Sequence, residues 1–501
     1  MKIKRLLIAN RGEIAVRIIS TAREMKIETV VVRNANEPDA MYVSLADIVF
    51  DNTEDPEEIP VFLNIGRLIE IAIETKCDAV HPGYGFLAEN AYFAQKCIEN
   101  KIIFIGPSPD AIYKMGNKTI ARELAMKQGI PMATGSRGNI GNEEEAAAAA
   151  GLIGYPVIIK AASGGGGRGM RIVRKPEELE KMFLIASKEA EIAFNDPSVF
   201  IEKYIENPKH IEFQILGDTK GNIVHLGERE CSIQRKHQKL LEEAPSSALD
   251  DNLRELMGSM AVRMARAVGY YSAGTVEFLL DSDRNFYFME MNTRIQVEHP
   301  VTEMITGIDL IEQQIRVAGG DPLAVTHKDD RIMGWSIECR INAEDVQAGF
   351  APDPGKIEKL VLPSDPYVRT DTGVRAGSAI VSSYDSMIAK LIIIGTDRKD
   401  AIRKCKLALD KVWIKGVKTT LPFFRMLVRN PVFIDGTFTT AFIEKQLEKY
   451  YLNSEYEEML AAWLATRLFV DENLSKDSFS VGYENEKEMS PWLLNKRINQ
   501  F

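Results

Sequence analysis

The residues best suited to chemistry stand at alternate positions in one short strand-like run. In an extended strand, Glu290, Asn292 and Arg294 would present their side chains on one face. Glu277 lies in the preceding strand-like run, and a hairpin across residues 281–284 would bring it beside that face. Two carboxylates and an amide oxygen suit Mg²⁺ or Mn²⁺ that bridges phosphate groups. The alternative is an ordinary amphipathic strand with one solvated face.

A second group of polar side chains follows at once. Arg294, Gln296, Glu298 and His299 offer a guanidinium, an amide, a carboxylate and an imidazole within six residues. Such a segment can hold a small oxyanion while Glu298 removes its proton. The alternative for Glu298 is a salt bridge to Arg294, which would occupy both charges without any chemistry.

Residues 163–170 form a glycine run that contains a formal G-x-G-x-x-G. A dinucleotide fold or a P-loop needs a helix directly after its glycines. Here strand-like residues 157–160 precede the run and 171–173 follow it, which predicts a glycine-rich hairpin. Such a hairpin can fold over a triphosphate, with Lys160 adding positive charge. The alternative is a flexible surface turn.

The run 228–239 is densely charged, and a solvated strand and loop is the usual explanation of such a run. The six histidines show no zinc-ligand spacing, and we predict no transition metal. They are His81, His210, His225, His237, His299 and His327.

The elements that must position these residues begin with a β-α-β pattern. A buried strand at 4–9, a helix whose apolar stripe includes Ile14 and Ile18, and a strand at 29–32 predict a parallel sheet with helical crossovers. From 202 to about 447 the pattern is mixed α+β. The remaining tail is charged, with a helix-like stretch at 456–468, and reads as a surface extension or an oligomer contact.

Composition limits the function classes. A length of 501 residues predicts two to four domains. The net charge of −10 argues against general nucleic-acid binding. No apolar run approaches a membrane span, and the first apolar run is too short for a signal peptide, so we expect a cytoplasmic protein. The five scattered cysteines predict reduced, mostly buried thiols.

Together the motifs resemble one family, the biotin carboxylase subunits of acetyl-CoA, propionyl-CoA and pyruvate carboxylases. The resemblance runs from about residue 8 to residue 447. The segments that carry it are 8–14, 81–87, the glycine run, 234–239, 290–302 and 338–345. One departure is the lid sequence, which has Ala161, Ala162 and Ser163 before four consecutive glycines, where many members carry one alanine and five glycines.

The resemblance implies an α/β and α+β multidomain ATP-grasp enzyme. Its parts would be a Rossmann-like N-terminal domain (1–115), an ATP-grasp domain (116–320) with a mobile lid at about 131–204, a C-terminal domain (321–447) and a charged extension (448–501).

The resemblance also implies a role for each matching residue. The expected ATP contacts are Lys118, Lys160, Gly165, Gly166, Glu202, Lys203, Ile205, His210, Gln234 and His237. The expected metal ligands are Glu277, Glu290 and Asn292, and the expected bicarbonate contacts are Lys239, Arg294, Gln296, Val297 and Glu298. Glu298 would be the general base and Arg340 the cation that faces biotin, with Lys239 and Arg294 completing the catalytic set.

The implied reaction uses ATP, Mg²⁺ or Mn²⁺, and bicarbonate to form carboxyphosphate, which carboxylates biotin. No Met-Lys-Met for biotin attachment occurs in the sequence, so we expect biotin on a separate carrier chain and a separate carboxyltransferase chain. The tail resembles that of the stand-alone biotin carboxylase subunit of two-subunit pyruvate carboxylases, which favours pyruvate as the final acceptor, a step of gluconeogenesis. A homodimer is implied too. Another ATP-grasp ligase and a non-catalytic ATP-binding regulator are the remaining alternatives.

Overall fold

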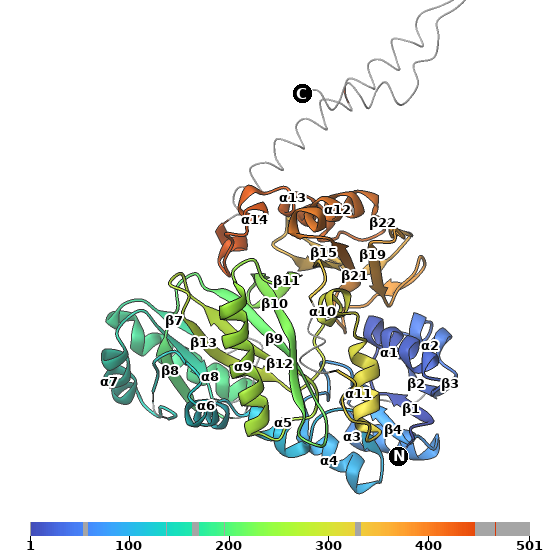
Figure 1. The fold of residues 1–501 in the computed structure, drawn as a ribbon, viewed down its shortest axis with the longest axis horizontal. Helices are drawn as coiled ribbons and strands as arrows, with labels where there is room; N and C mark the ends of the chain where they lie inside the picture. Colours follow the sequence, from blue (N-terminus) through green and yellow to red (C-terminus); the bar gives the residue numbers. More distant parts are fainter. Residues whose placement is uncertain are drawn as a thin grey trace, which may run out of the picture. The chain divides into compact units, whose positions relative to one another are not determined.

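The computed structural model describes residues 2–53, 59–136, 138–162, 170–194, 196–325, 332–445 and 466. The chain divides into two units, Met1–Glu444 and Lys445–Phe501, and every element discussed below lies in the first (Figure 1). Gly165 and Gly166 lie outside the described residues, as does the predicted helix at 456–468 apart from Thr466. Within the described ranges, no helix is both long and apolar enough to cross a lipid bilayer.

The N-terminal part is a parallel sheet covered on both faces. Its strands follow the order β3-β2-β1-β4-β5. Their bounds are β1 Arg5–Ile8, β2 Glu28–Asn34, β3 Ile48–Asn52, β4 Ala79–His81 and β5 Ile103–Phe104. Alternate strand residues pack against α1 (Gly12–Glu24) on one side and α3 (Ile65–Glu74) with α4 (Ala91–Glu99) on the other. The predicted β-α-β organisation is therefore confirmed.

A three-stranded antiparallel sheet follows, in the order β7-β6-β8. Its strands are β6 Val157–Ala161, β7 Arg171–Val173 and β8 Val199–Lys203. Helices α7 (Glu143–Ile153) and α8 (Leu179–Phe194) pack on it around a core of its own, which includes Val157, Phe183 and Ile201. The antiparallel pairing of β6 with β7 confirms that strands flank the glycine run, as predicted. Helix α6 (Lys118–Lys127) precedes this part.

The largest element is an eight-stranded antiparallel sheet in the order β13-β12-β9-β10-β11-β14-β21-β19. Its strands are β9 Lys209–Gly217, β10 Ile223–Arg235, β11 Gln238–Ala244, β12 Ser272–Leu280, β13 Phe286–Asn292, β14 Trp335–Asn342, β19 Val368–Thr372 and β21 Met387–Gly395. Because β11 pairs with β14, strands on both sides of residue 320 share one continuous sheet. Sequence patterns gave no sign of this sharing.

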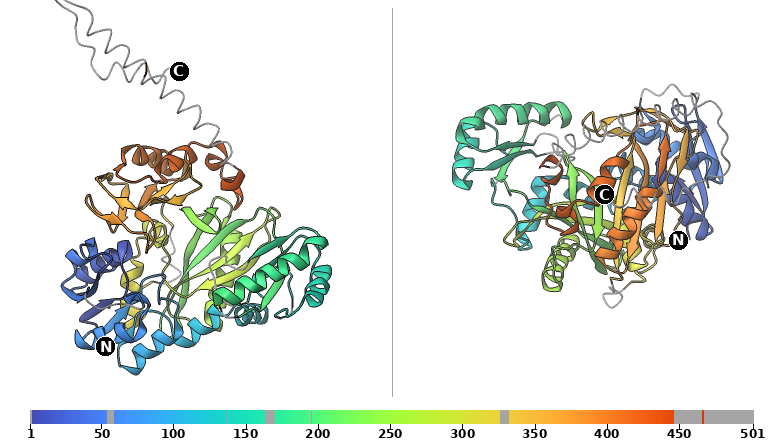
Figure 2. Two further views of the ribbon diagram at one scale, coloured as in Figure 1. Left: turned by 180° about the vertical axis from the view of Figure 1, so that it is seen from behind. Right: turned by 90° about the horizontal axis from the view of Figure 1, so that it is seen from above.

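Helices α9 (Asp251–Ala267), α10 (His299–Thr306) and α12 (Arg398–Lys411) are among those that pack on this sheet. Helix α9 packs on β9 and β10, in front of them in Figure 1, and the view from behind in Figure 2 shows their other face. Helix α10 packs on β11, β14 and β21, whereas α12 packs on β14 and β21. Side chains alternate along β14, so Cys339 faces Cys405 of α12, with their Sγ atoms 3.9 Å apart. Glu338 and Arg340 face the opposite way, toward the site.

Candidate active site

The chemistry-bearing side chains gather where strands of the large sheet meet the loop before α10. His210 and Glu212 come from β9, Lys239 from β11, Glu277 from β12 and Arg340 from β14. Glu298 stands at the N-cap position of α10. Strands β12, β9, β11 and β14 lie in one stretch of the sheet, with β10 between β9 and β11, so residues far apart in sequence reach one place.

Lys239 is the centre of this arrangement. Its ammonium donates to Glu212 at 2.5 Å, to Glu298 at 2.7 Å and to Glu277 at 2.9 Å. Burial lowers the pKa of Lys239, but the three carboxylates outweigh burial and raise that pKa well above its ordinary value. Lys239 is therefore a permanent cation.

Glu298 lies between two cations. Its Oε1 accepts from Lys239, and its Oε2 accepts from Arg340 at 2.8 Å. The side chain is fully buried, which raises its pKa, but Lys239, Arg340 and Arg229 together hold the pKa of Glu298 well below its ordinary value. Glu298 is therefore ionised. Arg294 pairs with Glu89 at 2.9 Å, so the alternative of an Arg294–Glu298 salt bridge is wrong for these two described residues.

Arg340 is shared between two acidic groups. Besides Glu298, its guanidinium contacts Glu242 of β11, a fully buried residue. Burial and the negative charge of Glu298 raise the pKa of Glu242, whereas Arg340 lowers it. Burial is the largest effect, and the resulting pKa of Glu242 is about 7. Burial lowers the pKa of Arg340, but the carboxylates of Glu242 and Glu298 outweigh burial and raise that pKa above its ordinary value. Arg340 therefore stays charged.

The predicted metal ligands are neighbours. Glu277 and Glu290 stand opposite each other in the β12–β13 hairpin, and Asn292 Nδ2 donates to Glu277 at 2.8 Å. Burial raises the pKa of Glu290, and the Glu277 charge raises it further. A buried carboxylate and a half-buried one in mutual repulsion, beside an amide, form an oxygen-rich set that fits a divalent cation. Strand β13 ends at Asn292, so Arg294 lies in the loop and not on the strand as predicted.

His210 and Gln296 also join this place. His210 Nε2 lies 2.9 Å from Glu277 Oε2, and Gln296 Nε2 donates to Glu277 Oε1 at 3.3 Å. Gln296 Oε1 in turn accepts from Arg294 at 3.1 Å. Apart from Val297 and Glu290, the predicted contacts of bicarbonate and of the metal thus form one connected network.

A separate charged group lies on the smaller sheet. Lys160 of β6 donates to Glu202 of β8 at 2.6 Å, and Arg122 of α6 pairs with the same carboxylate. Burial, with the charges of Lys118 and Arg122, lowers the pKa of Lys160 to about 7. Lys118 is the first residue of α6. These cations outnumber the single carboxylate, which suits an incoming anion.

The other predicted nucleotide contacts are not gathered in this way. Lys203 Nζ donates to the carbonyl oxygens of Gly154 and Tyr155, each at 3.0 Å, so its side chain already has partners. Ile205 follows β8, Gln234 lies near the end of β10, and His237 is exposed in the β10–β11 turn.

Sequence reasoning gave no role to several buried residues of the site. Arg229 is fully buried and donates to Glu212 at 2.5 Å and to Gln214 at 2.6 Å. It belongs to the charged run 228–239, whose strand part is therefore buried and not solvated. Glu212 alternates with His210 and Gln214 on β9, and that alternation was the available signal. Glu242 gave no such signal.

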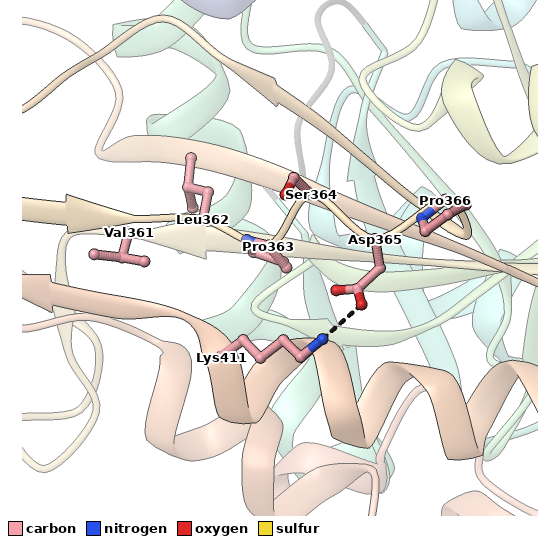
Figure 3. Close-up of a pocket in the computed structure, with 7 residues that line it drawn as sticks. All are labelled: Val361, Leu362, Pro363, Ser364, Asp365, Pro366 and Lys411. Atoms are coloured by element: carbon pink, nitrogen blue, oxygen red, sulfur yellow. Dashed lines mark hydrogen bonds and ion pairs between the residues drawn. The ribbon is translucent and has the colours of Figure 1, made fainter.

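The structure also has a cavity of about 420 Å³ (Figure 3). Residues 361–366 and Lys411 line it, and Lys411 pairs with Asp365 at 2.5 Å. None of the predicted site residues lines this cavity.

Comparisons with known proteins place this geometry in a family. The family model "Biotin carboxylase, N-terminal domain" matches residues 2–112, "Carbamoyl-phosphate synthase L chain, ATP binding domain" matches 117–326, and "Biotin carboxylase C-terminal domain" matches 338–445. Biotin carboxylase 1 of Bacillus subtilis is 52% identical over 443 residues, which are 88% of this chain and 98% of that protein. A pyruvate carboxylase subunit of Methanothermobacter thermautotrophicus is 48% identical over 88% of this chain and 89% of its own length.

A solved structure agrees with these matches. The biotin carboxylase domain dimer of the Hydrogenobacter thermophilus 2-oxoglutarate carboxylase, in complex with MgADP, ADP and bicarbonate, is similar with a TM-score of 0.87 and 48% identity. The match covers 89% of this chain and 98% of that one. Fold and site thus define an ATP-dependent ligase of the ATP-grasp class. The chain belongs to the biotin carboxylase family.

Proposed function

We propose that this chain carboxylates biotin, carried by a separate chain, at the expense of ATP and with bicarbonate as the carbon source. The observation that carries the proposal is the buried contact of Glu298 with both Lys239 and Arg340. When an anionic substrate binds beside a carboxylate held between two fixed cations, the cations can contact the substrate instead. The carboxylate can then accept a proton from the substrate.

Bicarbonate would lie among Lys239, Arg294, Gln296, the Val297 N–H and Glu298. In the described structure the cations hold the pKa of Glu298 too low for a strong base. An entering anion shares Lys239 and Arg294, and its own charge raises the proton affinity of Glu298. Glu298 therefore becomes an effective base only when bicarbonate is in place.

ATP would lie between the two charged groups. Lys118 and Lys160 would contact its phosphates, with Gly165, Gly166 and His237 beside them. Glu202, Lys203 and Ile205 would surround the adenine, the lysine through its backbone because its side chain is occupied, and His210 and Gln234 would lie near the ribose. Glu277, Glu290 and Asn292 would hold Mg²⁺ or Mn²⁺, which when bound neutralises charge on the phosphate oxygens.

Each step of the proposed reaction forms one bond and breaks another. Glu298 takes the bicarbonate proton, a bicarbonate oxygen attacks the γ-phosphorus, and the bond from that phosphorus to ADP breaks, which gives carboxyphosphate. Its C–O bond then breaks to give CO₂ and phosphate, and the phosphate takes the ureido N–H proton of biotin. The nitrogen forms a bond to CO₂ while Arg340 stabilises the enolate oxygen. Closure of the lid at about 131–204 would exclude water from the intermediate.

The wider assembly is also a proposal. The domain limits are those predicted from the sequence, the chain would form a homodimer, and its partners would be a biotinylated carrier and a carboxyltransferase chain. Pyruvate is the proposed final acceptor. The relatives named for pyruvate and for 2-oxoglutarate carboxylation are both 48% identical, so identity does not choose between acceptors, and acetyl-CoA or propionyl-CoA carboxylase is the alternative. The cytoplasmic location stays a prediction.

The test of the activity is ADP release by the purified chain with Mg-ATP and bicarbonate, in avidin-treated solutions, with and without free biotin. Stimulation by biotin supports the proposal. The proposal would be overturned if the chain is folded and binds ATP but its ADP release depends on neither bicarbonate nor biotin.

The acceptor is tested by adding a biotinylated carrier with its transferase chain and labelled bicarbonate. We expect label in oxaloacetate when pyruvate is supplied. Fixation only with an acyl-CoA would correct the acceptor and leave the first half-reaction intact.

A further inference from the structure

Lys390 of β21 is a lysine with no exposed surface, and the roles proposed above do not use it. Its ammonium donates to the carbonyl oxygen of Val297 at 2.9 Å and pairs with Glu13 of α1 at 3.0 Å. Asp371 of β19 lies 3.7 Å away. Lys390 thus touches the N-terminal sheet domain, the loop before α10 and the C-terminal strands together.

The groups around Lys390 are themselves held. The Tyr84 hydroxyl donates to Glu13, and Arg369 donates to both oxygens of Asp371, at 2.8 and 2.7 Å. A side chain on Gly373 would place its Cβ 2.5 Å from the Gly12 carbonyl carbon, so the segment after β19 lies directly on the start of α1. These contacts therefore fix the position of the Lys390 ammonium.

The charge of Lys390 is secure. Burial lowers the pKa of Lys390, but Glu13, Glu338 and Asp371 outweigh burial and raise it. Removing an ammonium from water costs several kcal/mol unless its partners are well placed. A single carboxylate would neutralise the charge, and two lie beside the ammonium. The hydrogen bond to Val297 is an additional feature, and it is directed at the residue before Glu298.

The preceding carbonyl is held as well. The Gln296 carbonyl oxygen lies 2.8 Å from Nδ1 of His299. Burial, with the charge of Lys390, holds the pKa of His299 well below its ordinary value, so this ring is neutral and donates through Nδ1. Because each peptide unit is planar, fixing the carbonyl groups of Gln296 and Val297 fixes both planes that flank Val297. The direction of the Val297 N–H and the start of Glu298 follow from these two planes.

We infer that Lys390 is a positioning residue for bicarbonate, which it serves by holding the Val297 carbonyl so that the Val297 N–H and the Glu298 carboxylate face the same small anion. The inference rests on the proposed function, because it takes Val297 and Glu298 as bicarbonate contacts. It differs from a purely structural tie between domains, which would act on stability and not on one substrate.

The test compares two variants of the full chain. Lys390→Met/Glu13→Gln removes the ammonium together with its closest carboxylate, so no buried charge is left unpaired against α1. Glu13→Gln alone is the matched control, because glutamine still accepts from Tyr84 and Lys390 while the ion pair between domains is lost. Measured are KM for bicarbonate, KM for ATP, ADP binding by calorimetry and the melting temperature.

For the double variant we expect the KM for bicarbonate to rise by about tenfold or more, the loss of one hydrogen bond from a charged donor. Its KM for ATP and its ADP affinity should stay within about twofold, and Glu13→Gln should lower the melting temperature with little change in the KM for bicarbonate. An unchanged KM for bicarbonate in the folded double variant, or equal rises in both KM values, would overturn the inference. Failure of the wild-type chain to cleave ATP in response to bicarbonate would instead overturn the proposed function on which it rests.

Discussion

In this molecule, two charged clusters shift the pKa of a half-buried lysine in opposite directions. In the Lys239 cluster (Glu212, Lys239, Glu277, Glu298 and Arg340), three carboxylates surround the ammonium and raise its pKa. In the Lys160 cluster (Arg122, Lys160 and Glu202), one carboxylate serves two cations, and the pKa of Lys160 falls to about 7.

The difference follows from what each cluster still lacks. Even with Arg229 counted, the Lys239 cluster and the neighbouring Glu242 and Glu290 hold more carboxylates than cations, which fits the divalent cation that we propose for this place. The Lys160 cluster has more cations than anions, and this excess of positive charge favours the binding of a phosphate. Four residues of the first cluster lie on one continuous sheet and Glu298 stands at the start of α10, so that cluster is held before any substrate arrives, whereas the second joins α6 to the smaller sheet. We infer that the chemical groups are preorganised and that the nucleotide completes its own site.

The largest expected effect comes from Glu298→Gln. The amide cannot take a proton from bicarbonate, so bicarbonate-dependent turnover should fall by roughly 10²- to 10⁴-fold, the usual contribution of a general base. ADP affinity, measured by calorimetry, should be retained.

Glu243→Gln is the matched control, because Glu243 is an equally buried carboxylate of β11 that pairs with Arg398 outside the cluster. Its turnover should stay near that of the wild type. If Glu298→Gln also turns over normally, Glu298 is not the base.

Arg340→Ala should act later in the reaction. Loss of the guanidinium removes the cation that we propose for the enolate oxygen, so carboxylation of biotin should fall by about 10²-fold, as when one donor to a developing oxyanion is lost. ADP affinity should not change. A comparable loss of ADP affinity would assign Arg340 a structural role. The Lys239 cluster would then no longer be distinct from the Lys160 cluster in its effect on nucleotide binding.

The smallest effect is a proton taken up when ATP binds. With a pKa of about 7, Lys160 is largely neutral above that pH. The triphosphate stabilises its charged form, so binding takes up a proton, and ATP affinity should fall as the pH rises from about 7.5 to 8.5, where the phosphates no longer titrate. Calorimetry in buffers of different ionisation enthalpy measures this uptake.

Lys160→Arg sharpens the test, because a guanidinium stays charged throughout this range. The variant should bind ATP without proton uptake. Equal uptake by both proteins would mean that another group titrates.

Much of the site could be predicted from local patterns. The alternation of Glu290 and Asn292 predicted a shared strand face, and the β12–β13 register places Glu277 opposite Glu290. The strands around the glycine run were predicted from their apolar residues. In each case the partners lie within one hairpin, where the sequence itself sets the pairing.

The remainder depends on strands that meet from far apart in the sequence. Glu212 reaches Lys239 from β9 across β10, and Lys390 reaches Val297 from β21. No local pattern states which distant strands are neighbours, so a single sequence gave no role to Glu212, Glu242 or Lys390. The end of β13 at Asn292, which places Arg294 in the loop, was missed because the polar alternation continues past the last strand residue.

In the proposed reaction, bicarbonate attacks ATP at the Lys239 cluster and biotin receives CO₂ from the resulting carboxyphosphate. This reaction is tested most directly by turnover with ¹⁸O-labelled bicarbonate, Mg-ATP and biotin, free of carbonic anhydrase so that the label does not exchange with water. We expect one bicarbonate oxygen in each inorganic phosphate released, because the bond that breaks in carboxyphosphate leaves that oxygen on phosphorus. Phosphate that carries no label would contradict it.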